Sequence, residues 1–244
     1  AYMAKIDLKS AYRSVRSHPS AHPWTCLHWT FEGDSKPTFL CDTRLPFGAR
    51  KAPAIFHRIT QAIRRYLARM GIEAIVVYLD VFFIAANSFA DCERVLCFLL
   101  RLLRQLGFGI AWNKVECLTQ YMTFLGVTID TSKGIVTLNE EKKMNLILAI
   151  QDYTKKARIS KKQLQRLAGK LSWAAAVIPW GRIHLRRLFD CLSLLKRDNH
   201  KCLTRNIRDD LLWWCWALRT PDLRRILFDT RPVITLQCDA SSHA

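Results

Sequence analysis

The chain has 244 residues, of which 50% are hydrophobic and 24% are charged. This composition is typical of a globular protein and excludes an intrinsically disordered one. The 38 lysines and arginines outnumber the 20 acidic residues, which gives a formal net charge of +18 and favours a polyanionic partner such as nucleic acid. The alternative is a basic, solvated surface without such a partner.

The nine cysteines are scattered along the chain, and none of them forms a C-x-x-C pair. This spacing favours buried free thiols in a reducing compartment over disulfides or a zinc site, so we expect an intracellular protein, nuclear or cytoplasmic. No apolar run reaches membrane-spanning length, because Arg101 and Arg104 interrupt the stretch from 99 to 110. The chain begins with Ala1 and shows no signal peptide, as expected of a piece of a longer protein.

The first part of the chain predicts a strand, a hairpin and a helix in that order. An apolar strand over 3–7 ends in an acid, and strands over 24–31 and 38–45 are separated by EGDSKP, whose residues are typical of a turn. An apolar stripe then predicts a helix over 52–70 that buries it. The stripe consists of Ile55, Ile59, Ile63, Leu67 and Met70.

A second hairpin and a second helix are expected next. Two β-rich runs flank Leu79-Asp80, and Ser88 is the N-cap of a helix that Gly107 ends. Further strands are expected over 110–112 and 122–129, the latter turning at Ser-Lys-Gly.

Beyond residue 138 the period is helical, with Asn139 and Ser160 as N-caps, and the last segment returns to a strand that ends in an acid. Trp213, Trp214 and Trp216 are expected mainly to pack under these helices, the alternative being a platform on which bases stack. The element order predicts an α+β core followed by an all-helical extension.

Asp7 and Asp80 each stand at the end of an apolar strand. An acid in such a place is unfavourable unless it is paired, hydrogen-bonded or bound to a metal. Taken singly, each is more often a turn or cap residue. Taken together in a strongly basic chain, the two suggest a shared Mg²⁺ site for nucleotidyl transfer, if the fold brings the two strand ends together.

Five segments occur in the order and at the spacing of reverse-transcriptase motifs A to E. They are AKIDLKSAYRSV, LPFGARKAPAIFHRI, YLDV, LGFGIAWNKVE and FLGVTID. The chain therefore resembles the reverse transcriptase of a retrotransposon. Residues 159–190 are similar to the segment that joins polymerase to ribonuclease H in DIRS-like and Ngaro-like (tyrosine-recombinase) elements, and LQCDASSHA resembles the first strand of a linked ribonuclease H (RNase H) domain.

The resemblance implies a division of the chain into four parts. Residues 1–137 would form a palm, an antiparallel sheet with packing helices, and part of the fingers. Residues 138–180 would form a helical thumb and 181–230 a helical connection. Residues 231–244 would be the first strand of a truncated RNase H-like domain, with Asp239 as a remnant metal ligand.

The resemblance also implies a role for individual residues. Asp7 and Asp80 would be catalytic and would hold Mg²⁺ with the Leu8 carbonyl, two ions being expected. The implied nucleotide contacts are Leu8, Tyr12, Phe47, Gly48 and Lys114. The implied template–primer contacts are Arg50, Lys51, Phe124, Leu125, Gly126, Lys161, Lys162 and Arg166. The partners would be an RNA template, a DNA primer or RNA–DNA hybrid, and deoxynucleoside triphosphates (dNTPs).

Each of these residues also has an ordinary structural interpretation: Tyr12 as a half-buried helix aromatic, LPFG as a common turn, Lys114 as a solvated loop lysine, and the helix lysines as solvated faces. The chain also departs from the family pattern at Val81, where motif C has a second aspartate. Valine cannot bind a hard cation, so we expect strongly reduced or absent polymerisation. Asp7 also lies too near Ala1 for the fingers strands that precede motif A in the family, so we expect impaired nucleotide binding if the sequence is a complete product, and an effect of Val81 alone if it is an excerpt. The alternatives are a non-catalytic nucleic-acid-binding protein that keeps the basic groove, and the translation of a decaying element.

Overall fold

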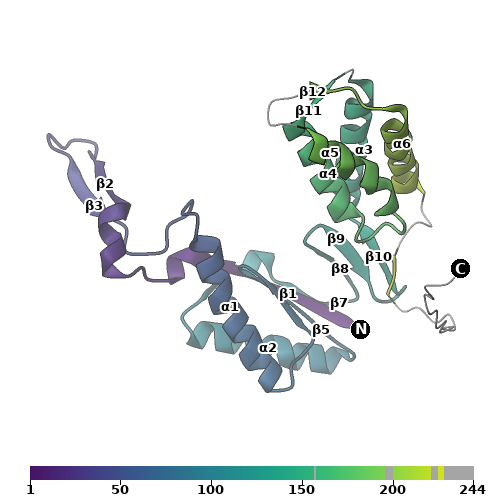
Figure 1. Ribbon diagram of the computed structural model, residues 1–244. Coiled ribbons are helices and arrows are strands. Elements are labelled where there is room, and N and C mark those ends of the chain that lie inside the picture. Colours follow the sequence, from purple (N-terminus) through teal and green to yellow (C-terminus); the bar gives the residue numbers. More distant parts are fainter. Residues whose placement is uncertain (157, 196–199, 221–224, 228–244) are drawn as a thin grey trace, which may run out of the picture. The chain divides into compact units, whose positions relative to one another are not determined.

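The computed structural model describes residues 1–156, 158–195, 200–220 and 225–227, and Figure 1 shows their arrangement. The chain divides into two compact units, Ala1–Met122 and Thr123–Ala244, each of which is described by itself. The boundaries expected at 137, 180 and 230 stay predictions. The expected strand over 231–244, with Asp239, lies outside the described residues.

The first unit is built on an antiparallel sheet with the strand order β4-β5-β1-β6, in which β7 also pairs with β1. The strands are β1 (Tyr2–Lys9), β4 (Ile75–Tyr78), β5 (Val81–Ala86), β6 (Gly109–Ile110) and β7 (Glu116–Thr119). The predicted strand at the N-terminus and the predicted hairpin around Leu79-Asp80 are confirmed. The strand expected over 110–112 is wrong in part, because Trp112 already belongs to the short 3₁₀ helix η3 (Trp112–Lys114).

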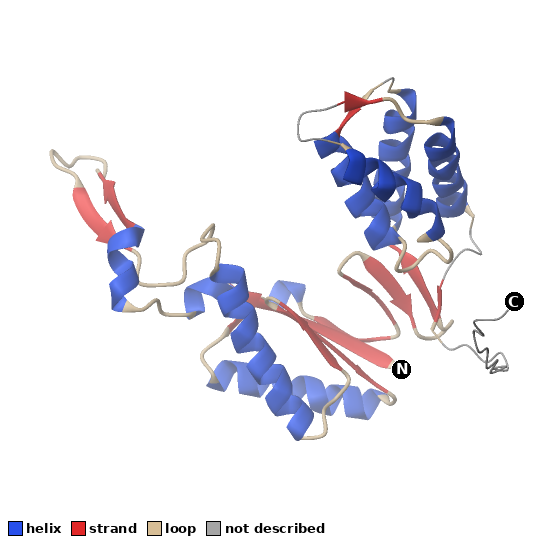
Figure 2. Ribbon diagram, viewed as in Figure 1, coloured by secondary structure: helices blue, strands red, loops and turns tan. Residues whose placement is uncertain are grey.

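Two helices, α1 (Ala52–Arg69) and α2 (Phe89–Gln105), pack against this sheet (Figure 2). Alternate residues of β1, namely Ala4, Ile6 and Leu8, belong to the core that the two helices cover. Because side chains alternate between the faces of a strand, Asp7 points to the other face of the sheet. Ser88 caps α2 as predicted, since its hydroxyl accepts a hydrogen bond from the Asp91 N–H.

The predicted buried stripe of α1 is only partly right. Ile63 and Leu67 are buried, but Ile55 is 42% exposed and Met70 lies beyond the helix end. Steps of four residues turn about 40° further than a full helical turn each time, so a strict i+4 series winds away from the core. Phe56, two turns before Ile63, takes the buried position.

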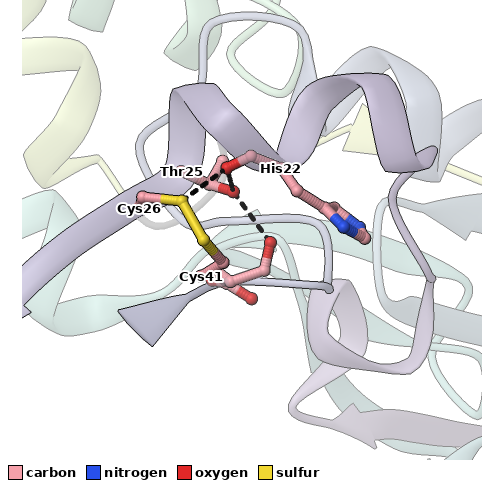
Figure 3. Close-up of a disulfide and its surroundings, with 5 residues drawn as sticks. His22, Thr25, Cys26 and Cys41 are labelled. Atoms are coloured by element: carbon pink, nitrogen blue, oxygen red, sulfur yellow. Dashed lines mark hydrogen bonds between the residues drawn. A yellow bond between two sulfur atoms is a disulfide. The ribbon is translucent and has the colours of Figure 1, made fainter. Parts of the chain in front are cut away.

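The hairpin of β2 (Cys26–Trp29) and β3 (Thr38–Cys41) is also confirmed, although it is shorter than predicted. It follows the 3₁₀ helices η1 (Ala11–Ser14) and η2 (Pro19–Thr25), and all eight of its strand residues are exposed. Its first and last residues form the Cys26–Cys41 disulfide, beside the Thr25 hydroxyl that donates to the His22 and Asp42 carbonyls (Figure 3).

The expectation of buried free thiols is therefore wrong for this pair, because the register of the hairpin brings Cys26 and Cys41 directly opposite each other. It is also wrong for Cys97, Cys117 and Cys202, which are exposed. The buried free thiols are Cys92, Cys191 and Cys215, and Cys238 lies outside the described residues. Burial raises the pKa of Cys92 and of Cys215.

The second unit combines a small sheet with a helical bundle. The sheet has the order β13-β10-β9-β8. Its first strand along the chain, β8, includes residues on both sides of the boundary at 122–123. Its strands are β8 (Tyr121–Phe124), β9 (Val127–Asp130), β10 (Ile135–Leu138) and β13 (Arg225–Ile226). The single strand predicted over 122–129 is wrong, because a tight turn at Leu125-Gly126 divides it into two paired strands.

The helices of the second unit surround one core (Figure 2). They are α3 (Glu140–Lys155), α4 (Lys161–Ala174), α5 (Arg186–Leu194), α6 (Arg205–Arg219) and the 3₁₀ helix η4 (Ile183–Leu185), with a short pair of strands, β11 (Ile159–Ser160) and β12 (His200–Lys201). Both predicted N-caps are confirmed: Asn139 caps α3, and Ser160 forms a full capping box with Gln163 on α4.

The three neighbouring tryptophans of α6 have different surroundings. Trp214 is fully buried, Trp213 stacks on His184 with ring centroids 3.8 Å apart, and Trp216 is 56% exposed. The predicted packing role therefore holds for two of the three. Nowhere in the described ranges is a helix both long and apolar enough to cross a membrane.

Candidate active site

β1 continues to Lys9, so Asp7 lies within the strand and not at its end as predicted, and Asp80 lies in the turn between β4 and β5. The fold brings the two acids together. Asp7 is directly opposite Val81 in the β1–β5 register, and the Leu8 N–H donates to the Asp80 carbonyl over 3.0 Å. Asp7 and Val81 lie on the sheet face away from α1 and α2, because their neighbours Ile6 and Phe82 are buried beneath those helices. The condition that the sequence left open, that the two tips meet, is fulfilled.

The two carboxyl groups influence each other. Burial raises the pKa of Asp80, and the nearby Asp7 carboxylate raises it further, whereas Lys114 acts in the opposite direction. The Lys114 Nζ lies 3.7 Å from an Asp7 carboxylate oxygen. Lys114 is the last residue of η3. This 3₁₀ helix is attached to β1 at its start, since the Ala111 N–H donates to the Asp7 carbonyl over 2.9 Å. The site thus combines two acids with one cation.

The backbone of the turn that carries Asp80 is unusual. Leu79 has a φ of 52°, a left-handed conformation that costs a residue other than glycine about 1–3 kcal/mol. Such strain persists only where the surrounding structure fixes it, here the paired strands β4 and β5. The turn was predicted but its positive φ was not, since leucine rarely adopts this conformation.

A pocket of about 520 Å³ adjoins Asp7. Its lining comes from the end of β1 and from the segment around η3: Asp7, Leu8, Lys9, Ser10, Ile110, Ala111, Trp112, Asn113 and Lys114. Trp112 and Asn113 were not among the predicted site residues. They adjoin Lys114 in a motif of the resemblance, which was the only signal that could have identified them.

Tyr12 stands between two aromatic rings beyond the end of β1. Its ring centroid lies 5.2 Å from that of Phe47 and 5.3 Å from that of Phe56. Phe47 is exposed, and Gly48 next to it has a φ of 87°, which only glycine adopts readily. The Leu45–Gly48 turn therefore packs beside Tyr12 through Phe47, and the nucleotide-binding role of these residues stays a prediction. Arg50 and Lys51 follow as exposed residues before α1.

Phe124, Leu125 and Gly126, implied as template–primer contacts, belong to the second unit. Leu125 and Gly126 both have positive φ values, 49° and 84°, as in the two-residue type I′ turns of tight hairpins. The Gly126 carbonyl accepts a hydrogen bond from the Asn139 N–H over 3.1 Å, which links the turn to the start of α3.

The three cations predicted on α4 differ in availability. The Lys161 ammonium donates to the Leu195 carbonyl within the unit, so it already has a partner. Lys162 and Arg166 are exposed and four residues apart, on the helix face opposite the buried Leu164 and Leu171.

In kind, the donors at the acid pair fit Mg²⁺, which takes oxygen ligands. A cation there would also favour the charged form of Asp80, whose pKa is raised first by burial and further by the Asp7 carboxylate. The site has few such oxygen donors. Across the described ranges, no group of three or more His, Cys, Asp or Glu side chains could hold a metal ion.

Residues 1–129 match the family model described as "Reverse transcriptase (RNA-dependent DNA polymerase)". The chain belongs to this family. Over 136 residues, 54% of the chain, it is 28% identical to the Gag-Pol polyprotein of Gibbon ape leukemia virus and 27% identical to that of Koala retrovirus. These 136 residues make up only 8% of either polyprotein, so the chain corresponds to a small part of them. The match identifies a reverse transcriptase domain of retroviral or retroelement type.

Solved structures agree with this assignment at the level of the fold. The foamy viral protease–reverse transcriptase in complex with double-stranded DNA matches 89% of the chain, with a TM-score of 0.67 and 24% identity, over 35% of that protein. The same enzyme with an RNA/DNA hybrid gives a TM-score of 0.63 and 24% identity, over 89% of this chain and 27% of that one. The predicted α+β class with antiparallel sheets and packing helices is thereby confirmed.

Proposed function

We propose that this chain is the polymerase part of a retrotransposon reverse transcriptase, which extends a primer on an RNA template by nucleotidyl transfer. The observation that carries the proposal is the convergence of Asp7, Asp80 and Lys114 at the end of the β1–β5 ladder of a reverse-transcriptase domain. The DIRS-like or Ngaro-like subtype and the linked RNase H domain belong to the same proposal and rest on the sequence resemblance. The proposed intracellular location, nuclear or cytoplasmic, rests on the free thiols, to which the Cys26–Cys41 disulfide is an exception.

The residues of the chain have separate tasks in this reaction. The primer hydroxyl attacks the α-phosphate of the incoming dNTP, and pyrophosphate leaves. Asp7, Asp80 and the Leu8 carbonyl would hold Mg²⁺, which supplies positive charge to the attacking oxygen and to the phosphates. Lys114 is close enough to the acid pair to donate a proton to the departing pyrophosphate. Tyr12 excludes a 2′-hydroxyl by its bulk.

Substrate contacts follow from the same arrangement. Gly48 lets the backbone approach the nucleotide closely, and Arg50 and Lys51 offer cations to phosphate. The partners we propose are an RNA template, a DNA primer or RNA–DNA hybrid, and dNTPs. The bound double-stranded DNA and RNA/DNA hybrid of the foamy viral structures support a duplex partner.

Val81 is expected to impair the reaction. Val81 is directly opposite Asp7 in the β1–β5 register. The Cβ atoms of residues paired in this way lie about 4.5–5.5 Å apart in an antiparallel sheet. A carboxylate there would be a third oxygen ligand beside the other two. With valine, the site lacks one negative charge where electrostatic stabilisation dominates the chemistry.

The test is primer extension on an RNA template with Mg²⁺, with the unaltered chain, Val81→Asp, and Val81→Asp combined with Asp7→Asn. We expect Val81→Asp to raise incorporation by roughly 10²-fold or more, and Asp7→Asn to abolish that gain. Circular dichroism should show that all three proteins are folded. No incorporation by the folded Val81→Asp variant would contradict the polymerase proposal, and equal rates for the variant and the unaltered chain would contradict the impairment.

A further inference from the structure

A disulfide closes the base of the β2–β3 hairpin (Figure 3). All eight strand residues of this hairpin are exposed, so no buried core supports its strands. A two-stranded hairpin without such support is only marginally stable in water. The Cys26–Cys41 bond closes a loop with a sequence separation of 15 residues, and it therefore contributes much of what holds the two strands together.

This disulfide is accessible to thiols from outside the protein. Cys26 and Cys41 are both exposed, and no other cysteine within the described ranges is bonded to a second one. Exposed disulfides are the labile ones, which exchange with thiols and serve in regulation. In a reducing compartment, as proposed for this chain, a disulfide is typically transient and responds to the redox state.

Hydrogen bonds join the base of the hairpin to the segment beside it. The Thr25 hydroxyl donates to the Asp42 carbonyl over 2.8 Å, and the Asp42 N–H donates to the Thr25 carbonyl over 3.1 Å. The Asp42 carboxylate pairs with Arg13 of η1 and accepts from the Arg44 N–H over 2.9 Å, and both contacts lower its pKa. Asp42 directly follows Cys41, so the disulfide helps to fix the carboxylate that holds Arg13.

The same segment leads to the Tyr12–Phe47 pair. The Leu45 N–H donates to the Val15 carbonyl over 2.9 Å, so the segment that follows the hairpin runs beside the end of η1. Tyr12 directly precedes Arg13, and its ring centroid lies 5.2 Å from that of Phe47. A contiguous set of contacts thus connects the disulfide with both aromatic rings.

We propose that Cys26 and Cys41 form a reversible disulfide switch, a thiol–disulfide exchange site that controls how firmly the Tyr12–Phe47 pair is held. With the bond closed, the hairpin base keeps Asp42 against Arg13. With the bond open, the strands separate more often and this ion pair loses its fixed acceptor. The consequence rests on the proposed function, because Tyr12 and Phe47 are the nucleotide contacts implied there.

The exchange partner is a dithiol in one direction and a small-molecule disulfide in the other. A thiolate of the dithiol attacks one of the two sulfurs, the Cys26–Cys41 bond breaks, and the released cysteine thiolate takes up a proton. The second thiolate of the dithiol then attacks the mixed disulfide and releases the other cysteine, which is protonated in turn. The protein gains two electrons and two protons, and the dithiol becomes a disulfide. Oxidised glutathione reverses the change and leaves as two thiols.

The test is hydrogen exchange on the full chain, treated with oxidised glutathione or with dithiothreitol, with alkylation and mass spectrometry to identify the free thiols. Reduction should lower the protection of the amides in β2 and β3 by roughly 10²-fold, as expected when a closed loop of this length is opened. The protection of the Leu45 amide should fall with it. The Cys26→Ser/Cys41→Ser double variant should resemble the reduced chain under both treatments. Cys97→Ser, which removes an exposed free thiol on α2, is the matched control and should respond as the unaltered chain does.

Two results would overturn the switch. Cysteines 26 and 41 that stay free under oxidised glutathione, or stay bonded under dithiothreitol while the chain is folded, would show that no reversible bond forms. Hairpin amides that respond while the Leu45 amide does not would restrict the bond to a local role.

These measurements need no nucleotide incorporation, so they are separate from the proposed function. A folded Val81→Asp variant that does not polymerise contradicts that function and not the exchange result. In an active Val81→Asp variant, reduction should raise the KM for dNTPs more than it lowers kcat. An unchanged KM would contradict the control of the Tyr12–Phe47 pair.

Discussion

Two tight turns with nearly the same sequence, Tyr-Leu-Asp-Val at 78–81 and Phe-Leu-Gly-Val at 124–127, make different sites. Each joins two antiparallel strands, and each has its leucine at positive φ, 52° for Leu79 and 49° for Leu125. They differ in the third residue, which is an acid in the first turn and glycine in the second. The turns also differ in backbone conformation, since Leu79 alone of its central pair has a positive φ, whereas both Leu125 and Gly126 do. The side chain and the conformation of the third residue together determine what each turn offers.

The surroundings follow that difference. Asp80 faces a second acid and a lysine, so its turn concentrates charge where a metal and phosphates would bind. Gly126 has no side chain, and the space is filled by the Lys142 stem from α3. The first turn acts through its own carboxylate, and the second acts by admitting a side chain from elsewhere. Three predictions address this contrast, the first and largest by converting one turn into the sequence of the other.

Asp80→Gly gives the first turn the Leu-Gly sequence of the second. In a Val81→Asp background we expect primer extension to fall by roughly 10²-fold or more, because the carboxylate is lost where charge develops in the reaction. The free energy of unfolding should change by less than about 1 kcal/mol, since glycine costs backbone entropy while an unfavourably buried acid is removed. Parallel rate and denaturant measurements check both parts. Retained activity would show that Asp80 is not a functional ligand.

Gly126→Ala is the corresponding change in the second turn. Alanine at a φ of 84° should lower the free energy of unfolding by about 1–2 kcal/mol. Its Cβ would also move the end of the Lys142 side chain, which is flexible and can shift at little cost. Thermal melts and denaturant titrations provide the check. Gly107→Ala, at a φ of 83° with no neighbouring atom within 4 Å of the added Cβ, is the control for backbone strain without displacement.

Much of the fold follows from local sequence signals. Three helix starts were predicted correctly from their N-cap residues, Ser88, Asn139 and Ser160. An N-cap oxygen accepts a hydrogen bond from a backbone N–H in the first turn, so this signal depends only on residues near in sequence. The hairpin at 26–41 was predicted from its turn residues, but its disulfide was not, since pairing of Cys26 with Cys41 depends on strand register. The break at Leu125-Gly126 was missed because leucine rarely adopts positive φ.

The candidate site shows the same limit. Both acids could be identified as strand-end residues, but their proximity depends on the β1–β5 pairing, which joins segments more than 70 residues apart. The availability of the cations on α3 and α4 could not be foreseen either, since Lys161 donates to the Leu195 carbonyl and Lys142 packs on Gly126. Sequence patterns thus indicated which residues matter, and tertiary contacts determine which of them are free to act.

The last prediction concerns the pH dependence of stability, where two acids should act in opposite directions. The pKa of Asp80 is raised by burial and by Asp7, so the charged form lowers the stability of the fold at neutral pH. Asp80→Asn should therefore be more stable than the unaltered chain at neutral pH. That advantage should shrink as the pH falls towards the usual pKa of an aspartate, about 3.9, because the native state takes up the proton first.

Asp130 supplies the opposite case within the same chain. Hydrogen bonds from the Ser132 side chain and from the Lys133 backbone lower the pKa of Asp130. Its charged form therefore stabilises the fold at pH values above the usual pKa of an aspartate. This contribution is lost as the pH falls through the lowered pKa. Asp130→Asn should be less stable at neutral pH, with the deficit closing in acid. Denaturant titrations of the three proteins across this pH range measure both differences. An Asp80→Asn variant no more stable than the unaltered chain at neutral pH would contradict the unfavourable burial and repulsion assigned to Asp80, and an Asp130→Asn variant that is not destabilised would contradict the role of its hydrogen bonds.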